Sequence, residues 1–598
     1  MATRKFHHKD DDGSLHVLGN GRLCVYEQGH NIDQVFGEPY SAPNFCRLTV
    51  DCDSESIRTP GTCIYQHKLK NGAQITDFVD SELPCLVRQI RTGRPFDMRL
   101  EVVKPFELLC EREGYVIYRA APGATVYGPH VTTRYAVMAL AWTGDIRFDG
   151  SVIRVGPAES CLYFVGSQEY DACVRMTEEI LRADIGQMYE STLAYWQTFT
   201  QRRRKLPSEL EEMGDSVAVL LKAQQSRCGG VLAGHNFHMA YIRDQYGVSR
   251  GLLALGYVEE AKQILCHYKR IWEREGRLHN AQGMGVDSIF HRHENDDVEI
   301  TGYLVIQAFD VFDADGDRNF LDSLLPMLKW AVEKQIANLA NDMLPFNGDE
   351  TYIAGGILPR HTLLHGSAEA TLLFIIGTER YCNYTGDRDG FSAIVARVKA
   401  AYAHNFIRDG YLMTNNPARL PKEAYPAFRF GVCEQCNDYY WTQKTDNSRY
   451  LCPHCFGGEG LPPVEDQAFC LKSVALTPFF LDAGFIDSDQ IRSMLDEMIA
   501  DYRESGKLPS AKAGNRNTGY DYGLFLFALT ILGDHLRHEM FRTVISMADS
   551  ADAWVEYYDD GVPAGTRCRP WESGINIAAC IRYLEGENGS KKLECKKI

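Results

Sequence analysis

The chain has 598 residues, which is too long for a single hydrophobic core and predicts two to four domains. Its formal net charge of −17 argues against a nucleic-acid or anionic-membrane surface. It contains no run of about 20 apolar residues, so no membrane span is expected. Residues 1–13 are polar and charged, so no signal peptide is expected, and the 19 cysteines then indicate reduced thiols in the cytoplasm.

Residues 1–175 are predicted to form a β-sandwich domain. Short segments rich in Val, Ile, Tyr and Thr alternate there with Gly, Pro, Asn and Asp, which is typical of strands and turns. The apolar spacing becomes helical from residue 176, and 176–207 is predicted to be a helical linker. The basic run at 202–205 is short and lies in an acidic chain, which favours a solvated linker over a nucleic-acid contact.

Residues 208–598 are predicted to form an (α/α)6 toroid of paired helices, because apolar residues recur at helical spacing along this part. The connections after alternate helices are short, and they lie at Gly256, Gly316, Gly386, Asp487 and Gly533. The intervening connections are long, at 276–295, 340–364, 407–464, 504–520 and 550–570. In an antiparallel series the long connections share one end, so they predict one active face. The expected helices span 236–255, 258–275, 296–313, 318–339, 365–385, 388–406, 465–484, 489–503, 521–534, 535–549 and 571–584.

The most specific motif is a pair of Cys-x-x-Cys knuckles in the longest loop. Cys433 and Cys436 form the first knuckle, and Cys452 and Cys455 form the second one, after fifteen intervening residues. This spacing predicts a zinc ribbon at about 430–458. Four thiolates leave no open coordination position, so the zinc is expected to be structural. His454 is an alternative ligand, but the four sulfurs are the preferred set.

Two glutamates on the expected active face are candidates for acid and base chemistry. Glu350 follows Asn-Gly-Asp in a turn-rich segment, and Glu556 lies in Trp-Val-Glu-Tyr-Tyr. Hydrolysis of a glycosidic bond needs one protonated carboxyl at the leaving oxygen and one carboxylate that activates water. The alternative for each is an ordinary solvated loop glutamate, which aromatic neighbours and the shared face make less favourable.

Two further polar segments are candidate sugar contacts. Tyr241, Arg243 and Asp244 precede the first toroid helix, and an arginine beside an aspartate offers donors and acceptors to hydroxyl groups. The alternative for this segment is a helix N-terminal ion pair. Arg292 begins the sequence Arg-His-Glu-Asn-Asp-Asp, part of which is expected to cap the third helix.

These segments together resemble glucoamylase-type glycoside hydrolases of the family 15 type. Tyr-Ile-Arg-Asp at 241–244 resembles the segment that holds the non-reducing sugar, and Arg-His-Glu-Asn-Asp at 292–296 resembles the opening of the third helix. Asn-Gly-Asp-Glu at 347–350 resembles the general-acid segment, and Trp-Val-Glu at 554–556, followed by Pro-Trp, resembles the general-base segment. The resemblance implies an N-terminal β-sandwich, a helical linker and an (α/α)6 catalytic domain.

The chain departs from the family pattern at three places. The acid segment normally contains Trp-Glu-Glu but here contains Gly-Asp-Glu, which leaves Asp349 as a rival to Glu350. The base segment has Glu-Tyr in place of Glu-Gln. The zinc ribbon is not part of the usual pattern, so the substrate of starch-degrading relatives is not transferred.

The resemblance implies an inverting, exo-acting glycoside hydrolase that removes a terminal sugar, an α-glucoside, from an oligosaccharide. Glu350 is expected to be the acid and Glu556 the base. Two alternatives remain: a glycoside phosphorylase on the same architecture, and a non-catalytic carbohydrate-binding or scaffold protein. A zinc-ribbon protein that binds nucleic acid conflicts with the negative net charge of the chain. The expected substrate contacts are Tyr241, Arg243, Asp244, Arg292, Asp349, Tyr352, Trp441, Trp554 and Trp571.

Overall fold

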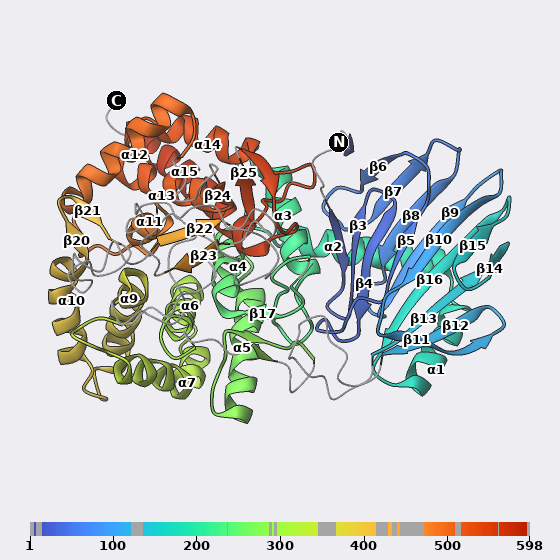
Figure 1. Cartoon of the computed structure of the whole chain (residues 1–598), viewed down its shortest axis with the longest axis horizontal. Coiled ribbons are helices and arrows are strands. Elements are labelled where there is room, and N and C mark those ends of the chain that lie inside the picture. Colours follow the sequence, from blue (N-terminus) through green and yellow to red (C-terminus); the bar gives the residue numbers. More distant parts are fainter. Residues whose placement is uncertain are drawn as a thin grey trace.

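The computed structural model consists of a β-sandwich beside a larger helical part (Figure 1). The sandwich is built from the N-terminal residues, and the helices are built from the central and C-terminal residues, as the sequence predicts. The structure describes residues 5–6, 15–120, 136–235, 237–285, 290–291, 296–344, 366–413, 429–432, 439–442, 472–508, 516–559 and 561–594.

Two antiparallel sheets form the sandwich. The nine-stranded sheet has, in spatial order, β1 (Lys5–Phe6), β6 (Ser54–Arg58), β7 (Tyr65–Leu69), β8 (Gln74–Val79), β9 (Cys85–Arg91), β16 (Glu159–Ser167), β13 (Ala136–Thr143), β12 (Tyr115–Ala120) and β11 (Phe106–Arg112). The seven-stranded sheet has β14 (Ile146–Phe148), β15 (Val152–Val155), β10 (Phe96–Val102), β5 (Cys46–Thr49), β4 (Asn31–Gly37), β3 (Leu23–Gln28) and β2 (His16–Gly19).

The nine-stranded sheet is covered on both faces. Alternate side chains such as Phe164 belong to the core between the sheets, whereas Tyr163 and Val165 belong to a second core on the other face. Helices α1 (Tyr170–Ile180) and α2 (Ile185–Gln201) supply the apolar side chains of this second core. The central strands are therefore continuous apolar runs, which is what burial on both faces requires. Strand β16 is buried at every position but its first.

The basic run after α2 is tied to the helical part by ion pairs. Arg203 Nε lies 2.6 Å from Asp215, and Arg204 lies 2.7 Å from Glu585 near the C-terminus. Arg202 pairs with a glutamate of the second toroid helix. The Arg202 and Arg204 side chains remain in contact with solvent, in keeping with a solvated linker, whereas the Arg203 side chain is mostly shielded from solvent at its ion pair.

The helical part begins with α3 and continues as pairs of helices. The bounds are α3 (Glu211–Ala223), α4 (Ile242–Leu255), α5 (Val258–Glu275), α6 (Ile300–Asp315), α7 (Arg318–Ala337), α9 (Ala368–Thr385), α10 (Ser392–Phe406), α11 (Lys472–Phe480), η3 (Ser488–Ile491), α12 (Arg492–Ser505), α13 (Asp521–Leu532), α14 (Arg537–Ser546) and α15 (Pro570–Glu594). Small antiparallel sheets lie in the connections: β17 (Ala240–Tyr241), β18 (Ala281–Gln282) and β19 (Phe290–His291); β20 (Ile407–Arg408) and β21 (Tyr411–Leu412); β22 (Arg429–Val432) and β23 (Tyr439–Thr442); β24 (Arg516–Thr518), β25 (Tyr557–Asp559) and β26 (Val562–Ala564).

Alternate helices close into a ring. Contacts run from α4 to α6, α9, α11, α13 and α15 in turn, and α15 packs back against α4. Within the described residues, α5, α7, α10 and α14 each pack outside a member of this ring. The ring helix α13 carries apolar side chains almost all round, which a position inside a helical layer requires.

Helices α4 and α15 approach unusually closely because glycines face each other. A Cβ atom on Gly251 would lie 2.5 Å from the Cα atom of Gly574, and one on Gly574 would lie 2.2 Å from the carbonyl oxygen of Gly247. Both neighbouring atoms belong to backbone, so a larger residue would force the helices apart. This contact holds the two helices together, and their N-terminal turns carry the site described below.

The helical part is joined to the sandwich by polar contacts near residue 238. His235 Nε2 lies 2.6 Å from Asp33, and the His238 ring stacks on Phe36 and contacts Gln34 at 3.0 Å. Both histidines therefore pack between the helical part and the sandwich. Of the helices in the described ranges, none combines the length and apolar character needed to span a membrane.

Candidate functional site

A pocket of about 600 Å³, counting its open mouth, lies where α4, α15 and the small sheet β24–β25–β26 meet. Its walls combine aromatic rings with carboxylates and guanidinium groups. The lining residues are Ala233, Phe237, Tyr241, Arg243, Asp244, Thr518, Tyr520, Glu556, Tyr557, Arg569, Trp571 and Glu572. Five residues that the sequence singled out, from segments more than 300 positions apart, therefore share one pocket: Tyr241, Arg243, Asp244, Glu556 and Trp571.

The first turn of α4 contributes Arg243 and Asp244. Arg243 Nη1 lies 3.3 Å from the buried Glu299 carboxylate, which immediately precedes α6. Asp244 is buried and pairs with Arg569 at 3.1 Å. The predicted alternative of an ion pair at the helix start is thus met in part, although the partners lie outside α4, Glu299 just before α6 and Arg569 just before α15. These pairs fix the orientation of both side chains toward the pocket.

Glu556 precedes β25, and its backbone N–H and its carboxylate both bind Thr566, which follows β26. Its Oε2 atom accepts a hydrogen bond from the Thr566 amide at 2.9 Å. Burial alone would raise the pKa of Glu556, but the Arg569 charge, the Thr566 amide and the Tyr557 hydroxyl outweigh it, so the net pKa is lowered. Glu556 is therefore ionised at neutral pH and can accept a proton from a bound water.

Arg569 and Glu572 are site residues that the sequence reasoning missed. Arg569 donates to both carboxylate oxygens of Glu572, at 2.9 and 3.2 Å, and to the carbonyl oxygen of Ala233 at 2.6 Å. Glu572 is only 2% exposed, and burial raises its pKa to about 7 even though Arg569 opposes the shift. Their position in the sequence could have indicated them, because both flank Pro570-Trp571 at the start of α15, and Trp571 is an expected substrate contact.

Aromatic rings line the same pocket. Trp571 contacts Tyr520 edge-on at 5.6 Å between ring centroids, and Phe237 lies at 6.0 Å from Tyr241 in the same manner. Such rings suit the apolar faces of a sugar, whose hydroxyl groups need the polar residues described above. The pocket can thus bind a neutral polyhydroxylated ring.

Trp554 does not lie where the sequence reasoning expected it. Its side chain is 1% exposed and belongs to the core, and its indole N–H donates to the carbonyl oxygen of Val544 at 2.8 Å. The expectation of a sugar contact is corrected for this reason: the ring is buried and its donor is already used. Tyr557 lines the pocket in its place.

Other polar residues converge on the same end of the ring. Tyr303 of α6 hydrogen-bonds to Glu369 of α9 and contacts Trp571 edge-on at 6.1 Å. Asp296, expected among helix-capping residues, is instead bonded to His279 at 2.8 Å and to the Asn280 amide at 2.7 Å. It therefore fixes the preceding loop rather than the start of α6. The first turns of α4, α6, α9 and α15 lie together, as the shared-face prediction requires.

Several expected site residues fall outside the described residues. They are Arg292, Asp349, Glu350 and Tyr352, together with the four cysteines of the zinc motif. Trp441 lies in β23, which pairs with β22, but its side chain is likewise outside the description. The first Cys-x-x-Cys knuckle falls in the connection between these two strands.

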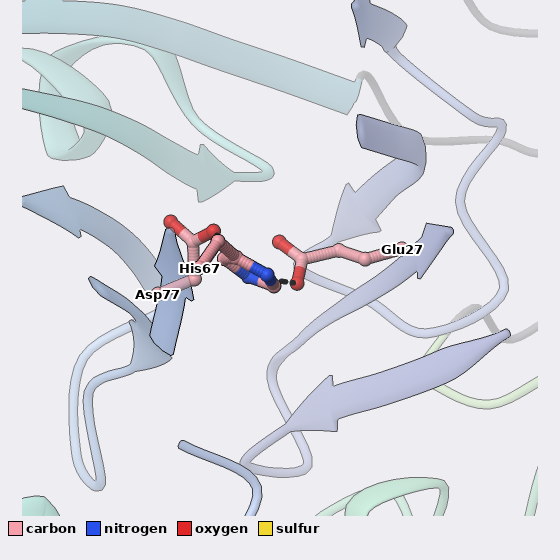
Figure 2. Close-up of side chains that lie close together, drawn as sticks. All are labelled: Glu27, His67 and Asp77. Atoms are coloured by element: carbon pink, nitrogen blue, oxygen red, sulfur yellow. Dashed lines mark ion pairs between the residues drawn. The ribbon is translucent and has the colours of Figure 1, made fainter. Parts of the chain in front are cut away.

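A separate buried cluster crosses the core of the sandwich. Figure 2 shows Glu27 of β3 facing His67 of β7 and Asp77 of β8, with His67 Nε2 at 3.8 Å from Glu27 and 3.3 Å from Asp77. Arg88 of β9 forms two hydrogen bonds with Asp77, both at 2.8 Å. Burial opposes ionisation of Asp77, but Arg88 and His67 outweigh it and lower the pKa, whereas burial raises that of Glu27 well above its usual range.

This residue set could ligate a metal, since its ligand atoms lie within 4.8 Å of one another. However, the Arg88 guanidinium forms two hydrogen bonds with Asp77 and lies 3.5 Å from Glu27, so a cation already serves both carboxyl groups. The donor set therefore fits an internal ion-pair network between the two sheets better than a cation site.

Comparison with solved structures identifies the architecture. A crystal structure of a bacterial glucoamylase complexed with acarbose superimposes with a TM-score of 0.65 at 11% identity, covering 98% of this chain and 94% of that one. A putative kojibiose phosphorylase from the human microbiome gives a TM-score of 0.54 at 9% identity, covering 95% and 86%. No protein-family model and no curated protein matches the sequence. The chain therefore has a glucoamylase-like fold, as its motifs predicted.

Proposed function

We propose that the protein is an inverting, exo-acting glycoside hydrolase that removes a terminal sugar, an α-glucoside, from an oligosaccharide. One observation carries the proposal: an ionised, largely buried Glu556 faces the same pocket as Arg243, Asp244 and a set of aromatic rings. A water-activating carboxylate beside groups that orient a sugar is what inversion requires. The partner carboxyl group is assigned to Glu350, because the segment around it resembles the general-acid segment.

In this mechanism Glu556 takes a proton from water as that water attacks the anomeric carbon. Glu350, with Asp349 as its rival, gives a proton to the leaving oxygen. The two carboxyl groups of an inverting pair lie roughly 6.5–9.5 Å apart, which leaves room for the water. Arg243 and Asp244 hold hydroxyl groups of the terminal sugar, and Trp571 and Tyr241 form its walls. Glu572 is a poor candidate for the acid, because Arg569 occupies both of its oxygens.

The charges of the pocket support hydrolysis over phosphorolysis. Both guanidinium groups in the pocket are engaged, Arg243 with Glu299 and Arg569 with Asp244 and Glu572. Among the described residues that line the pocket, no cation is left for a phosphate dianion, which would enter beside the Glu556 carboxylate at an electrostatic cost. The phosphorylase alternative shares the fold and is distinguished by experiment.

The test is turnover of a panel of α-linked disaccharides with and without phosphate, followed by proton NMR of the first-formed anomer. We expect phosphate-independent release of a β-configured sugar. Glu556→Gln should lower kcat by about 10²–10⁴-fold with unchanged folding. Asp559→Asn, three residues further on in β25, is the matched control, because Asp559 does not line the pocket. Phosphate-dependent release of a sugar phosphate, or retained configuration, would refute hydrolysis by inversion; no turnover on any glycoside would favour the binding-protein alternative.

We also propose one structural zinc ion, held by Cys433, Cys436, Cys452 and Cys455 in a ribbon inserted in the helical domain. The spacing of the knuckles and the β22–β23 pairing around the first one support it. The described cysteines are free thiols, which supports a reducing compartment, the cytoplasm. Elemental analysis of protein purified without chelators should give one zinc per chain, and a metal-free, fully active protein would contradict the proposal.

A further inference from the structure

A turn of the helical part that contacts the sandwich through Arg227 carries a cysteine in unusual surroundings. Cys228 lies in the tight turn that follows α3, where the Gly229 amide donates to the Ser226 carbonyl oxygen and the Ser226 amide donates to the Gly230 carbonyl oxygen, both at 2.8 Å. The Ser226 hydroxyl lies 3.0 Å from the Cys228 sulfur and accepts from the Cys228 amide at 3.2 Å. The turn thus holds the sulfur in a fixed position, and the side chain remains partly exposed.

A buried histidine faces this thiol. His267 of α5 is 3% exposed, and its buried Nε2 atom has no hydrogen-bond partner among the described residues. The imidazole is nevertheless close enough to the Cys228 thiol to interact with it. Gly230 makes room for the ring, because a Cβ atom there would lie 3.0 Å from His267 Nε2. Burying an imidazole nitrogen without a hydrogen-bond partner is costly, and a negatively charged sulfur beside the ring would offset part of that cost.

The surroundings favour the thiolate. Burial alone would raise the pKa of Cys228, but the His267 imidazole, the Ser226 hydroxyl and the Gly230 amide outweigh it and lower the pKa to about 6. Other described thiols behave in the opposite way, because burial raises their pKa without a compensating donor of this kind. They include Cys24, Cys46, Cys63, Cys85, Cys161, Cys173, Cys266, Cys382, Cys568 and Cys580.

We propose that Cys228, paired with His267, is a reactive thiol that small hydroperoxides oxidise to a sulfenic acid. The thiolate sulfur attacks the terminal oxygen of the peroxide, an S–O bond forms and the O–O bond breaks. The leaving hydroxide or alkoxide takes the proton from the His267 imidazolium. Sulfur is oxidised by two electrons, the peroxide is reduced to water or alcohol, and the imidazole is left neutral.

The first test is the pH dependence of alkylation in the native protein. Iodoacetamide is applied at pH 5–9, and the modification of each of the 19 cysteines is followed by peptide mass spectrometry. We expect the Cys228 rate to reach half its maximum near pH 6, and the thiols of the core to stay unmodified until unfolding. No labelling of Cys228 in the folded protein, or a midpoint at the value of about 8.5 of a free thiol, would overturn the proposal.

The second test removes the imidazole. His267→Gln should move the midpoint of the alkylation profile toward about pH 8.5. At pH 6 the thiolate fraction then falls about 150-fold, but the more basic thiolate is about 15-fold more nucleophilic. The alkylation rate at pH 6 should therefore fall by about tenfold. His404→Gln, an exposed histidine on α10, is the matched control and should change neither value. Should His267→Gln fail to fold, the wild-type profile still decides the question.

The oxidation step is tested with hydrogen peroxide and dimedone, which traps sulfenic acids. Wild-type protein at pH 7 should carry the adduct at Cys228, and Cys228→Ser should lose that adduct without gaining another. A folded wild-type protein that alkylates at Cys228 but forms no dimedone adduct would refute the oxidation step.

Discussion

Glu572 offers a direct measurement of the electrostatics of the pocket. Its pKa rises from 4.5 to about 7 on folding, because burial disfavours the charged form more than Arg569 favours it. At about 1.36 kcal/mol per pKa unit, this rise corresponds to about 3 kcal/mol. A carboxyl group whose folded pKa is raised contributes stability that is fully present below pH 4.5. That stability is lost as the pH rises to 7 and above.

Glu572→Gln removes this titration and keeps the shape of the protonated side chain. We expect the variant to match the wild type near pH 4.5 and to be more stable by about 3 kcal/mol at pH 8. For a cooperative unit of about 400 residues, the unfolding entropy is about 2.1 cal/mol/K per residue. The Tm of the variant should therefore rise relative to that of the wild type by about 3 °C between pH 5 and pH 8.

The assay is thermal unfolding of both proteins at half-unit steps from pH 5 to pH 8, followed by calorimetry or tryptophan fluorescence. Glu585→Gln on the same helix is the matched control, because Glu585 pairs with Arg204 near the surface. It removes the same formal charge from α15 outside the pocket. A Tm difference between Glu572→Gln and wild type that stays constant with pH, or that shrinks as the pH rises, would refute this account of Glu572.

Arg88→Met should destabilise the sandwich by about 3–5 kcal/mol, because it leaves the Asp77 carboxylate buried without its cation, and urea unfolding followed by fluorescence measures the loss. Gly574→Ala should cost about 1–3 kcal/mol or prevent folding, because the new methyl group would press on the backbone of α4; an unchanged Tm would contradict the close approach of the helices. Glu350→Gln and Asp349→Asn, compared by kcat on a slow-leaving disaccharide, decide between the two candidate acids: the larger loss identifies the acid, and a near-normal Glu350→Gln would transfer that role to Asp349.

The outline of the fold could be predicted because its signals are local. Helices α4, α6, α9 and α13 end at Gly256, Gly316, Gly386 and Gly533, and each of these glycines has the left-handed conformation that favours glycine at such a position. The helical spacing of apolar residues predicted the helices, and segments rich in β-branched residues between turn residues predicted the sandwich. Short and long connections alternate, and this alternation alone predicted which end of the ring carries the polar residues.

The composition of the site depended on tertiary contacts that no local pattern encodes. Trp554 and Glu556 are two residues apart, yet one is buried with its indole N–H bonded to a carbonyl and the other faces the pocket. The raised pKa of Glu572 arises because α15 packs against α4 and removes water from a carboxylate. Motif and spacing thus predicted that the segments around Arg243, Glu556 and Trp571 meet. Packing decided which side chains reach the pocket and what charge they carry, because desolvation and ion pairing depend on neighbours hundreds of residues away.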